Sequence, residues 1–310
     1  MSGRAYLCRG PLVTHFSDLT LATTTHNNYQ MLADMLTSFE TNLGTLDKVV
    51  IVDDGSRRAS ALPPVGSGVR LIRNEIAHGF CQAADMALRA VRTQYALLVD
   101  ADVLFEPGDF AGGYAEFQRG NWAWVNFRAT NFQGQAQSGY DQRLMPPWIF
   151  AAGNTAFRIW EKFQPMLVRS AGQRIVEVEA AHASCTLVSM DAFRAIDGFD
   201  RWYWQYQSDI DLSLRLRKAG WRVGVDVGYT VKHEGAGGKN GGVSRVLDLY
   251  RSRLHLYENF YPASRFYLRP LLFVRHLFEL AWFALVALFK NEPRLAMRIE
   301  MVKGVLKGYR

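Results

Sequence analysis

The stretch from Tyr95 to Phe105 reads Tyr-Ala-Leu-Leu-Val-Asp-Ala-Asp-Val-Leu-Phe, and it decides the fold class of this chain. Its apolar run, Ala96 to Val99, has the length and composition of a buried strand. The strand delivers two carboxylates, Asp100 and Asp102, to its C-terminal end. Ligands of open α/β sheets bind beyond that end of the strands, and paired carboxylates can hold a divalent cation. The motif alone is common, and a solvated strand end is the alternative explanation for it.

Strands and helices alternate on the N-terminal side of this stretch. Three short apolar runs predict strands, and two longer segments with apolar residues at helical spacing predict helices between them. This order favours an α/β fold with a mostly parallel central sheet flanked by helices. The predicted strands are 19–24, 48–52 and 69–73, and the predicted helices are 28–43 and 79–91.

The C-terminal half is less regular. We expect strands at 122–127, 184–189 and 221–227, a loop over 131–148, and a helix from Asp209 to Ala219 that ends at Gly220. From Val243 onward the composition becomes aromatic, basic and helical. The expected organisation is an N-terminal extension (1–17), a catalytic domain (18–242) and a helical, basic C-terminal extension (243–310).

Composition narrows the class of protein. The three cysteines, Cys8, Cys81 and Cys185, are widely spaced and odd in number, which argues for a reducing compartment and against a disulfide framework or a zinc site. Residues 1–18 lack the apolar segment of a secretory signal. The formal net charge of +7 is compatible with nucleic acid, anionic lipid or nucleotide partners and does not choose among them.

The C-terminal extension carries an interfacial pattern. The apolar run 277–289 is shorter than the roughly 20 residues that a spanning helix needs. The last predicted helix places apolar side chains on one face and most of its cations elsewhere; the apolar set is Leu295, Ile299, Val302 and Leu306. We expect this extension to associate with an anionic membrane without crossing it. The alternative is that it packs on the catalytic domain or forms a homo-oligomer.

Six short blocks together resemble the family 2 glycosyltransferases, which are inverting enzymes of the GT-A fold, and most closely their bacterial rhamnosyltransferase-like members. The blocks occur in the family's order over roughly residues 18–240. They are Thr24-Thr25-His26-Asn27-Asn28, Val52-Asp53-Asp54-Gly55-Ser56, Ile72-Arg73-Asn74 with His78-Gly79-Phe80, Leu98-Val99-Asp100-Ala101-Asp102, Gly198-Phe199-Asp200 leading to Asp209-Ile210-Asp211-Leu212 and Leu216-Arg217-Lys218-Ala219-Gly220-Trp221, and Val231-Lys232-His233.

The resemblance implies a binding site for a nucleoside-diphosphate sugar. Thr24 and Asp54 would contact the base of the donor, Arg73 would lie near the nucleotide, and Asp100 would meet the ribose. The alternatives are a turn-forming aspartate for Asp54 and a solvated surface residue for Arg73.

A metal site is also implied by the resemblance. Asp102 would bind Mn²⁺ or Mg²⁺, because a nucleoside diphosphate leaving group develops charge that a cation stabilises. His233 would supply a further ligand, which would suit Mn²⁺ better than Mg²⁺. A hydrogen-bonded loop histidine is the alternative for His233.

An inverting transfer needs a general base, and the resemblance assigns it to Asp209. The family usually has Glu-Asp here, whereas this chain has Ser208-Asp209, so the hydrogen bonds that support the base are in doubt. An acidic residue in the first turn of a helix can also simply complement the helix dipole, with Ser208 as the N-cap.

Among the aromatic residues before the base, Trp204 is the candidate for binding the acceptor sugar; packing in the core is the alternative.

The expected partners are a UDP-, dTDP- or GDP-sugar donor and a glycan or lipid-linked acceptor of the cell envelope; no nucleic acid is expected. The expected location is the cytoplasmic face of the cell membrane.

A sugar nucleotidyltransferase is a second hypothesis for the function, but the segment Thr23 to Asn28 lacks the glycine and the cation of a phosphate-binding loop. A non-enzymatic, membrane-associated glycan-binding protein is a third, and it gives Asp102 and Asp209 no role.

Overall fold

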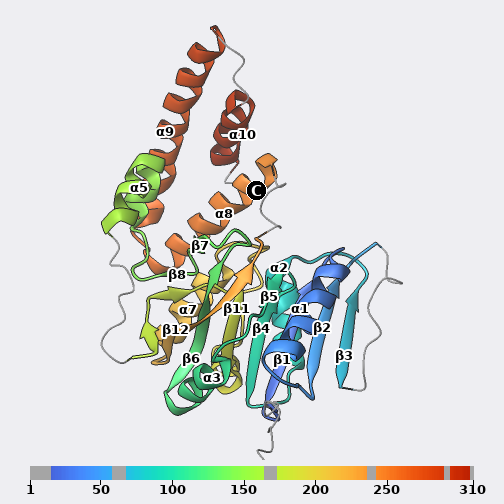
Figure 1. Ribbon diagram of the computed structural model, residues 1–310. Coiled ribbons are helices and arrows are strands. Elements are labelled where there is room, and N and C mark those ends of the chain that lie inside the picture. The colour runs from blue at the N-terminus through green and yellow to red at the C-terminus, as the bar shows by residue number, and fades with distance from the viewer. Residues whose placement is uncertain (1–14, 58–67, 164–172, 236–241, 290–293, 308–310) are drawn as a thin grey trace, which may run out of the picture.

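The computed structural model describes residues 15–57, 68–163, 173–235, 242–289 and 294–307, and the structural statements below concern these residues. Residues 1–14 of the expected N-terminal extension and the glycine-rich segment 236–241, which follows the block ending at His233, lie outside this part of the chain. The described residues form a twisted central sheet with helices on both faces and a group of helices beyond one end of the sheet (Figure 1).

The sheet confirms the predicted mixed α/β class. Its N-terminal part consists of four mutually parallel strands, β1 (Leu19–Thr25), β2 (Val49–Asp54), β3 (Val69–Asn74) and β4 (Tyr95–Asp100). Beyond β4 the sheet continues with an antiparallel strand, β11 (Cys185–Ser189), and then β6 (Trp122–Thr130) and β12 (Arg222–His233), which are parallel to each other. The order is β3-β2-β1-β4-β11-β6-β12-β5, where β5 is Val103–Leu104.

Short strands occupy part of the predicted loop over 131–148. β7 (Ala136–Gln137) pairs with β6, and β8 (Tyr140–Asp141) pairs with β10 (Ala180–Ala181) in a separate two-stranded sheet. β9 (Ile175–Glu177) pairs with β12.

Two hydrophobic cores cover the two faces of the sheet. In β4 the side chains of Leu97 and Val99 pack with α1 (Tyr29–Asn42) and α3 (Phe110–Arg119). Ala96 and Leu98 point to the other core, because successive side chains of a strand alternate. That second core contains residues of α2 (Phe80–Ala90), α6 (Met190–Ala195) and α7 (Ser208–Lys218). An apolar strand buried on both faces explains why the run preceding Asp100 contains no polar residue.

The sheet places a binding crevice at the ends of β1 and β4. These two strands are neighbours, and the connections that follow them run in opposite directions along the strand order, from β1 to β2 and from β4 to β6. Such a switch point leaves a crevice at the carboxyl ends of the strands. Thr24 and Asp100 are register partners at this point.

The C-terminal helices have a core of their own. α8 (Gly242–Phe260), α9 (Ser264–Ala287) and α10 (Arg294–Leu306) pack with α4 (Pro147–Ala152) around buried side chains that include Leu254, Leu272 and Met301. α9 projects away from the sheet, with α10 running back beside it (Figure 1). α5 (Asn154–Phe163) packs on α4.

The length of α9 corrects one prediction. The apolar run 277–289 was expected to be too short to cross a membrane. Residues 277–287 of this run belong to a continuous helix of 24 residues that is long and apolar enough to do so by these two criteria alone. The length of this helix was underestimated from the sequence because two charged residues, Arg275 and Glu279, interrupt its apolar composition. In the fold these two side chains pair with each other and lie on the inner side of the helix.

Candidate active site

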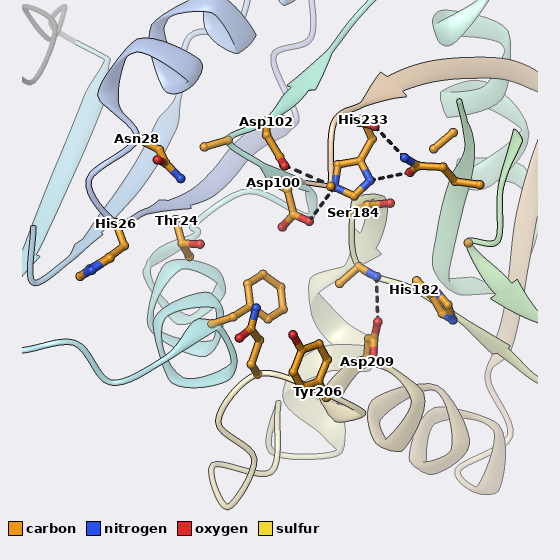
Figure 2. Close-up of a pocket in the computed structure, with 18 of the residues that line it drawn as sticks. Thr24, His26, Asn28, Asp100, Asp102, His182, Ser184, Tyr206, Asp209 and His233 are labelled. Carbon is orange, nitrogen blue, oxygen red and sulfur yellow. Dashed lines mark hydrogen bonds and ion pairs between the residues drawn. The ribbon is translucent and has the colours of Figure 1, made fainter. Parts of the chain in front are cut away.

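A cavity of about 410 Å³ opens at the switch point of the sheet (Figure 2). It is bounded by the ends of β1, β4 and β12, by the start of α7 and by the β7 region. Five residues that the sequence singled out line it: Thr24, Asp100, Asp102, Asp209 and His233. The fold therefore brings together residues that are up to 209 positions apart in the chain.

Asp100, Asp102 and His233 form a compact group of potential metal ligands. One ligand atom from each lies within 4.8 Å of the other two. His233 Nε2 is 3.3 Å from Asp102 Oδ1 and 3.6 Å from Asp100 Oδ2. Their proximity follows from the pairing of β12 with β5, in which His233 is opposite Val103. Two carboxylates and an imidazole are a donor set that fits a divalent cation such as Mn²⁺.

Gln137 orients the histidine ring for this role. His233 Nδ1 is 2.8 Å from Gln137 Oε1, and the amide of Gln137 donates to the His233 carbonyl oxygen, also at 2.8 Å. An N–H on Nδ1 leaves the lone pair of Nε2 directed toward the two carboxylates. Metal-binding histidines are commonly held in this way by a hydrogen bond from their second nitrogen.

The electrostatics of this group favour a positive charge between its members. Burial raises the pKa of Asp100 to about 7, partly offset by His233 and reinforced by Asp102 and Asp209. Burial alone would lower the pKa of His233, but Asp102 and Asp100 raise it above its ordinary value. The pKa values of Asp100 and His233 are both raised because two carboxylates lie close together in a partly desolvated site, where their negative charges are unfavourable. A cation would reduce this unfavourable interaction.

Asp209 faces this group across the cavity from the first turn of α7 (Figure 2). Its Oδ2 accepts a hydrogen bond from the Ala183 backbone N–H at 3.2 Å, and its Oδ1 lies 2.9 Å from the Ile210 N–H. Ser208, expected as the N-cap, is instead the first helical residue, and Gln207 occupies the cap position with φ of 67°. The carboxylate is thus fixed by backbone donors rather than by a side chain at position 208.

Two further titratable side chains lie on the Asp209 side of the cavity. His182 Nε2 is 3.8 Å from Asp141 Oδ2. Burial alone would lower the pKa of His182, but Asp141 and Asp209 raise it. His182 is therefore biased toward the charged imidazolium beside Asp209. His182 also lines the cavity.

Asp54 and Arg73 lie beside the cavity rather than on its surface. The Asp54 carboxylate accepts hydrogen bonds from Asn74 Nδ2 and from the backbone N–H groups of His78 and Gly79, all at 2.8–3.0 Å. Arg73 donates to the Ser56 carbonyl oxygen at 2.9 Å. Asp54 therefore anchors the loop that follows β3, and Arg73 anchors the loop that follows β2.

Trp204, the candidate acceptor-binding residue, does not line the cavity. Its ring lies against Gly79, and its carbonyl oxygen accepts from the Cys81 N–H at 3.1 Å. Its neighbour Tyr206 lines the cavity instead. Two further lining residues, His26 and Asn28, belong to a block that carries the family resemblance but had been given no role. The sequence reasoning missed three others, which had no motif around them: Gln137, His182 and Arg245.

Comparison with known proteins identifies relatives of this chain. Residues 20–182 match the family model "Glycosyl transferase family 2". Among curated proteins, the chain is 53% identical over 38 residues to an N-acetylglucosaminyl-diphospho-decaprenol L-rhamnosyltransferase of Mycobacterium tuberculosis, a match that covers 12% of each chain.

Solved structures share the fold. A mannosyltransferase from Pyrobaculum calidifontis, in complex with GDP-Man and Mn²⁺, aligns with a TM-score of 0.53 over 94% of this chain and 86% of its own, at 14% identity. GalNAc-T7 with UDP, GalNAc and Mn²⁺ also gives 0.53, over 70% of this chain and 43% of its own, at 15% identity. Both similarities support the GT-A fold. Because the family model spans more than half of its residues, the chain belongs to glycosyl transferase family 2.

Proposed function

We propose that the protein transfers a sugar, with inversion, from a nucleoside-diphosphate donor to an acceptor hydroxyl. One observation carries the proposal: the group Asp100, Asp102 and His233 and the carboxylate of Asp209 line the same cavity. The first group suits the diphosphate of a donor, and the second suits the proton of an acceptor. A glycan-binding protein without activity has no use for this arrangement.

The donor would lie along the ends of β1 and β4. We propose that Thr24 and the loop held by Asp54 form the end of the site that receives the base, because Asp54 anchors the His78–Gly79 backbone beside the cavity. Arg73 would act there through its bond to Ser56. Asp100 would meet the ribose, and Asp102 with His233 would hold a divalent cation.

Bound there, Mn²⁺ or Mg²⁺ would neutralise the charge that develops on the leaving diphosphate. The imidazole favours Mn²⁺ of the two. The Mn²⁺ present in the two GT-A structures above is compatible with this choice.

The transfer itself would use Asp209 as the general base. The acceptor hydroxyl oxygen forms a bond with the anomeric carbon while the bond from that carbon to the donor phosphate oxygen breaks. The hydroxyl proton passes to Asp209, and the nucleoside diphosphate leaves. The backbone donors on Asp209 keep its carboxylate in position, which matters because general bases act only within hydrogen-bond reach of the proton that they take.

A lipid-linked acceptor is the favoured substrate class. The rhamnosyltransferase relative is named for an acceptor with a diphosphate and a polyprenyl chain, although it matches only 38 residues. We propose an acceptor of this type, a glycosyl diphosphate attached to a lipid of the cell envelope.

The surface of α9 supports an acceptor in a membrane. The exposed face of this helix is apolar, and its internal charges Arg275 and Glu279 are turned toward its neighbours. A contiguous patch of large, exposed apolar side chains indicates an interaction surface. We propose that this face lies in the anionic, cytoplasmic side of the cell membrane, with the exposed cations Arg265, Lys303 and Lys307 near lipid head groups. The apolar set is Phe266, Leu271, Val274, Phe278, Trp282 and Leu285.

A thermal-shift panel tests the proposed function. UDP-, dTDP- and GDP-sugars are added with Mn²⁺ or with a chelator, and a ligand that binds only the folded state raises the melting temperature. We expect one donor class to raise it only with Mn²⁺, and slow hydrolysis of that donor to release the nucleoside diphosphate. Release of pyrophosphate from a nucleoside triphosphate and a sugar phosphate would instead identify a nucleotidyltransferase.

A further inference from the structure

A second cavity, of about 520 Å³, adjoins the first on the Asp209 side. The two cavities share Gln137, Ser138 and His182 as lining residues. Gln207 and Ile210, on either side of the base in sequence, line the second cavity. A molecule in this cavity would therefore present its end to Asp209 and to a donor sugar in the first.

Two amide side chains that line the second cavity carry oxygens without hydrogen-bond partners in the described part of the chain. Gln207 is only 8% exposed, and its Oε1 has no hydrogen-bond partner in the described part of the chain. The Oε1 of Gln142, which also lines this cavity, is likewise buried and unpaired within the described residues. Buried amide oxygens without partners are rare, because an unsatisfied buried acceptor destabilises the fold. Sugar hydroxyl groups are the donors that would satisfy both.

The backbone of Gln207 supports a functional role for this side chain. Its φ of 67° lies in the left-handed region, which residues other than glycine, asparagine and aspartate seldom adopt. Strained positions of this kind tend to occur at binding and catalytic sites. Here the strained residue lines the cavity two residues before the proposed base.

The second cavity is lined by charged side chains as well as aromatic ones. His182 and Asp141 lie at the end nearest the first cavity, and Arg253 of α8 is close enough to affect the pKa of both. The Arg253 guanidinium lies over the Tyr257 ring at 5.7 Å. The wall formed by α5 contributes Phe157 and Trp160. α5 packs on α4, and α4 packs on α9, the helix with the exposed apolar face.

We propose that the second cavity is the acceptor site, and that it binds the sugar and diphosphate of a glycosyl diphospholipid. Gln207 accepts a hydrogen bond from a sugar hydroxyl, Arg253 pairs with the diphosphate, and Trp160 contacts the start of the lipid chain. The chain then follows α5 toward α9. This site rests on the proposed transferase function, and it identifies the residues that select the acceptor.

The test uses N-acetylglucosaminyl diphosphate with a medium-length alkyl chain, and the neutral alkyl glycoside of the same sugar. Binding is measured by calorimetry on the full chain. We expect Gln207→Gly to weaken binding of both probes by about 3- to 10-fold, the range of one neutral hydrogen bond. Its melting temperature should not fall, because glycine accepts a positive φ. A loss of binding in a protein of unchanged stability then reflects the missing amide.

Arg253→Gln should weaken the diphosphate probe by about 10- to 100-fold, the range for a bond to a charged group, and the neutral glycoside little. The matched control is Arg251→Gln, two residues away on α8, which lies over Trp202 and lines neither cavity. It should bind both probes like the unaltered protein.

Two results would overturn the acceptor site: failure of the unaltered protein to bind the diphosphate probe, or unchanged binding in both Gln207→Gly and Arg253→Gln. Equal losses for both probes in Arg253→Gln would remove the diphosphate assignment. These outcomes are separate from failure of the transferase proposal, which would appear as no donor binding and no donor hydrolysis in the unaltered protein.

Discussion

Glu279→Gln should loosen the packing of α9 against α10. The Glu279 carboxylate receives Arg275 Nε at 3.0 Å, His276 Nδ1 at 3.2 Å and Arg298 Nη1 at 3.0 Å. Burial alone would raise its pKa, but the histidine and the two guanidinium groups lower it from 4.5 to about 2. At about 1.4 kcal/mol for each pH unit, this corresponds to about 3 kcal/mol of stabilisation. The neutral glutamine side chain would also leave Arg275 and Arg298, both mostly buried, without the carboxylate that they share.

Urea unfolding measures this loss, and hydrogen exchange of α10 shows whether it is local. The matched control is Glu300→Gln, whose exposed pair with Lys303 should contribute less than about 1 kcal/mol. The Glu279 contribution should be fully present above pH 4.5 and decline as the pH falls toward 2, because the carboxylate must then take up a proton. Equal stability of Glu279→Gln and Glu300→Gln would refute the reasoning.

Three further outcomes are expected. Asp209→Asn should retain donor affinity and lower kcat by about 100-fold or more, measured by single-turnover transfer; near-normal rates would leave Asp209 as a carboxylate that only complements the helix dipole. Replacing Phe278 and Trp282 by serine should abolish salt-sensitive sedimentation with anionic vesicles, whereas equal binding to neutral vesicles, or no binding by the unaltered protein, would favour an oligomer interface. Gly79→Ala should destabilise the protein by about 1–3 kcal/mol in a thermal melt, since φ is 85° and the added Cβ would lie 2.6 Å from Trp204; an unchanged melt would contradict this packing.

Local sequence was enough to predict the parallel sheet and the carboxylates at its edge. The runs before Asp54 and Asp100 are apolar because both faces of these strands are covered, and this signal can be read within a few residues. Asp102 could be singled out because it follows a buried strand closely, whereas Asp209 could be named as the base only through the family resemblance. His233 could be named as a ligand only through the family resemblance.

Features that depend on distant contacts could not be predicted in this way. Gln137 reaches the cavity through β7, which pairs with β6, and His182 follows β10, which pairs with β8. Both β7 and β8 lie in the segment 131–148 that was expected to be a loop. Glu279 interrupts an apolar run in the sequence, and only the fold reveals that Arg298, 19 positions later, neutralises it. The left-handed backbone of Gln207 leaves no trace in composition or periodicity. Each of these features depends on pairing or packing between residues far apart in the chain.

Calorimetry of the donor with Mn²⁺ tests the proposed mechanism most directly. The donor that gives the largest thermal shift is titrated into the unaltered protein, into Asp102→Ala, and into the control Asp191→Ala, which removes an exposed carboxylate outside the cavity. We predict that Asp102→Ala lowers Mn²⁺-dependent affinity by at least about 10-fold, while Asp191→Ala binds normally. Unchanged, Mn²⁺-dependent affinity in Asp102→Ala would contradict the assignment of Asp102 and His233 to the cation that holds the diphosphate of the donor.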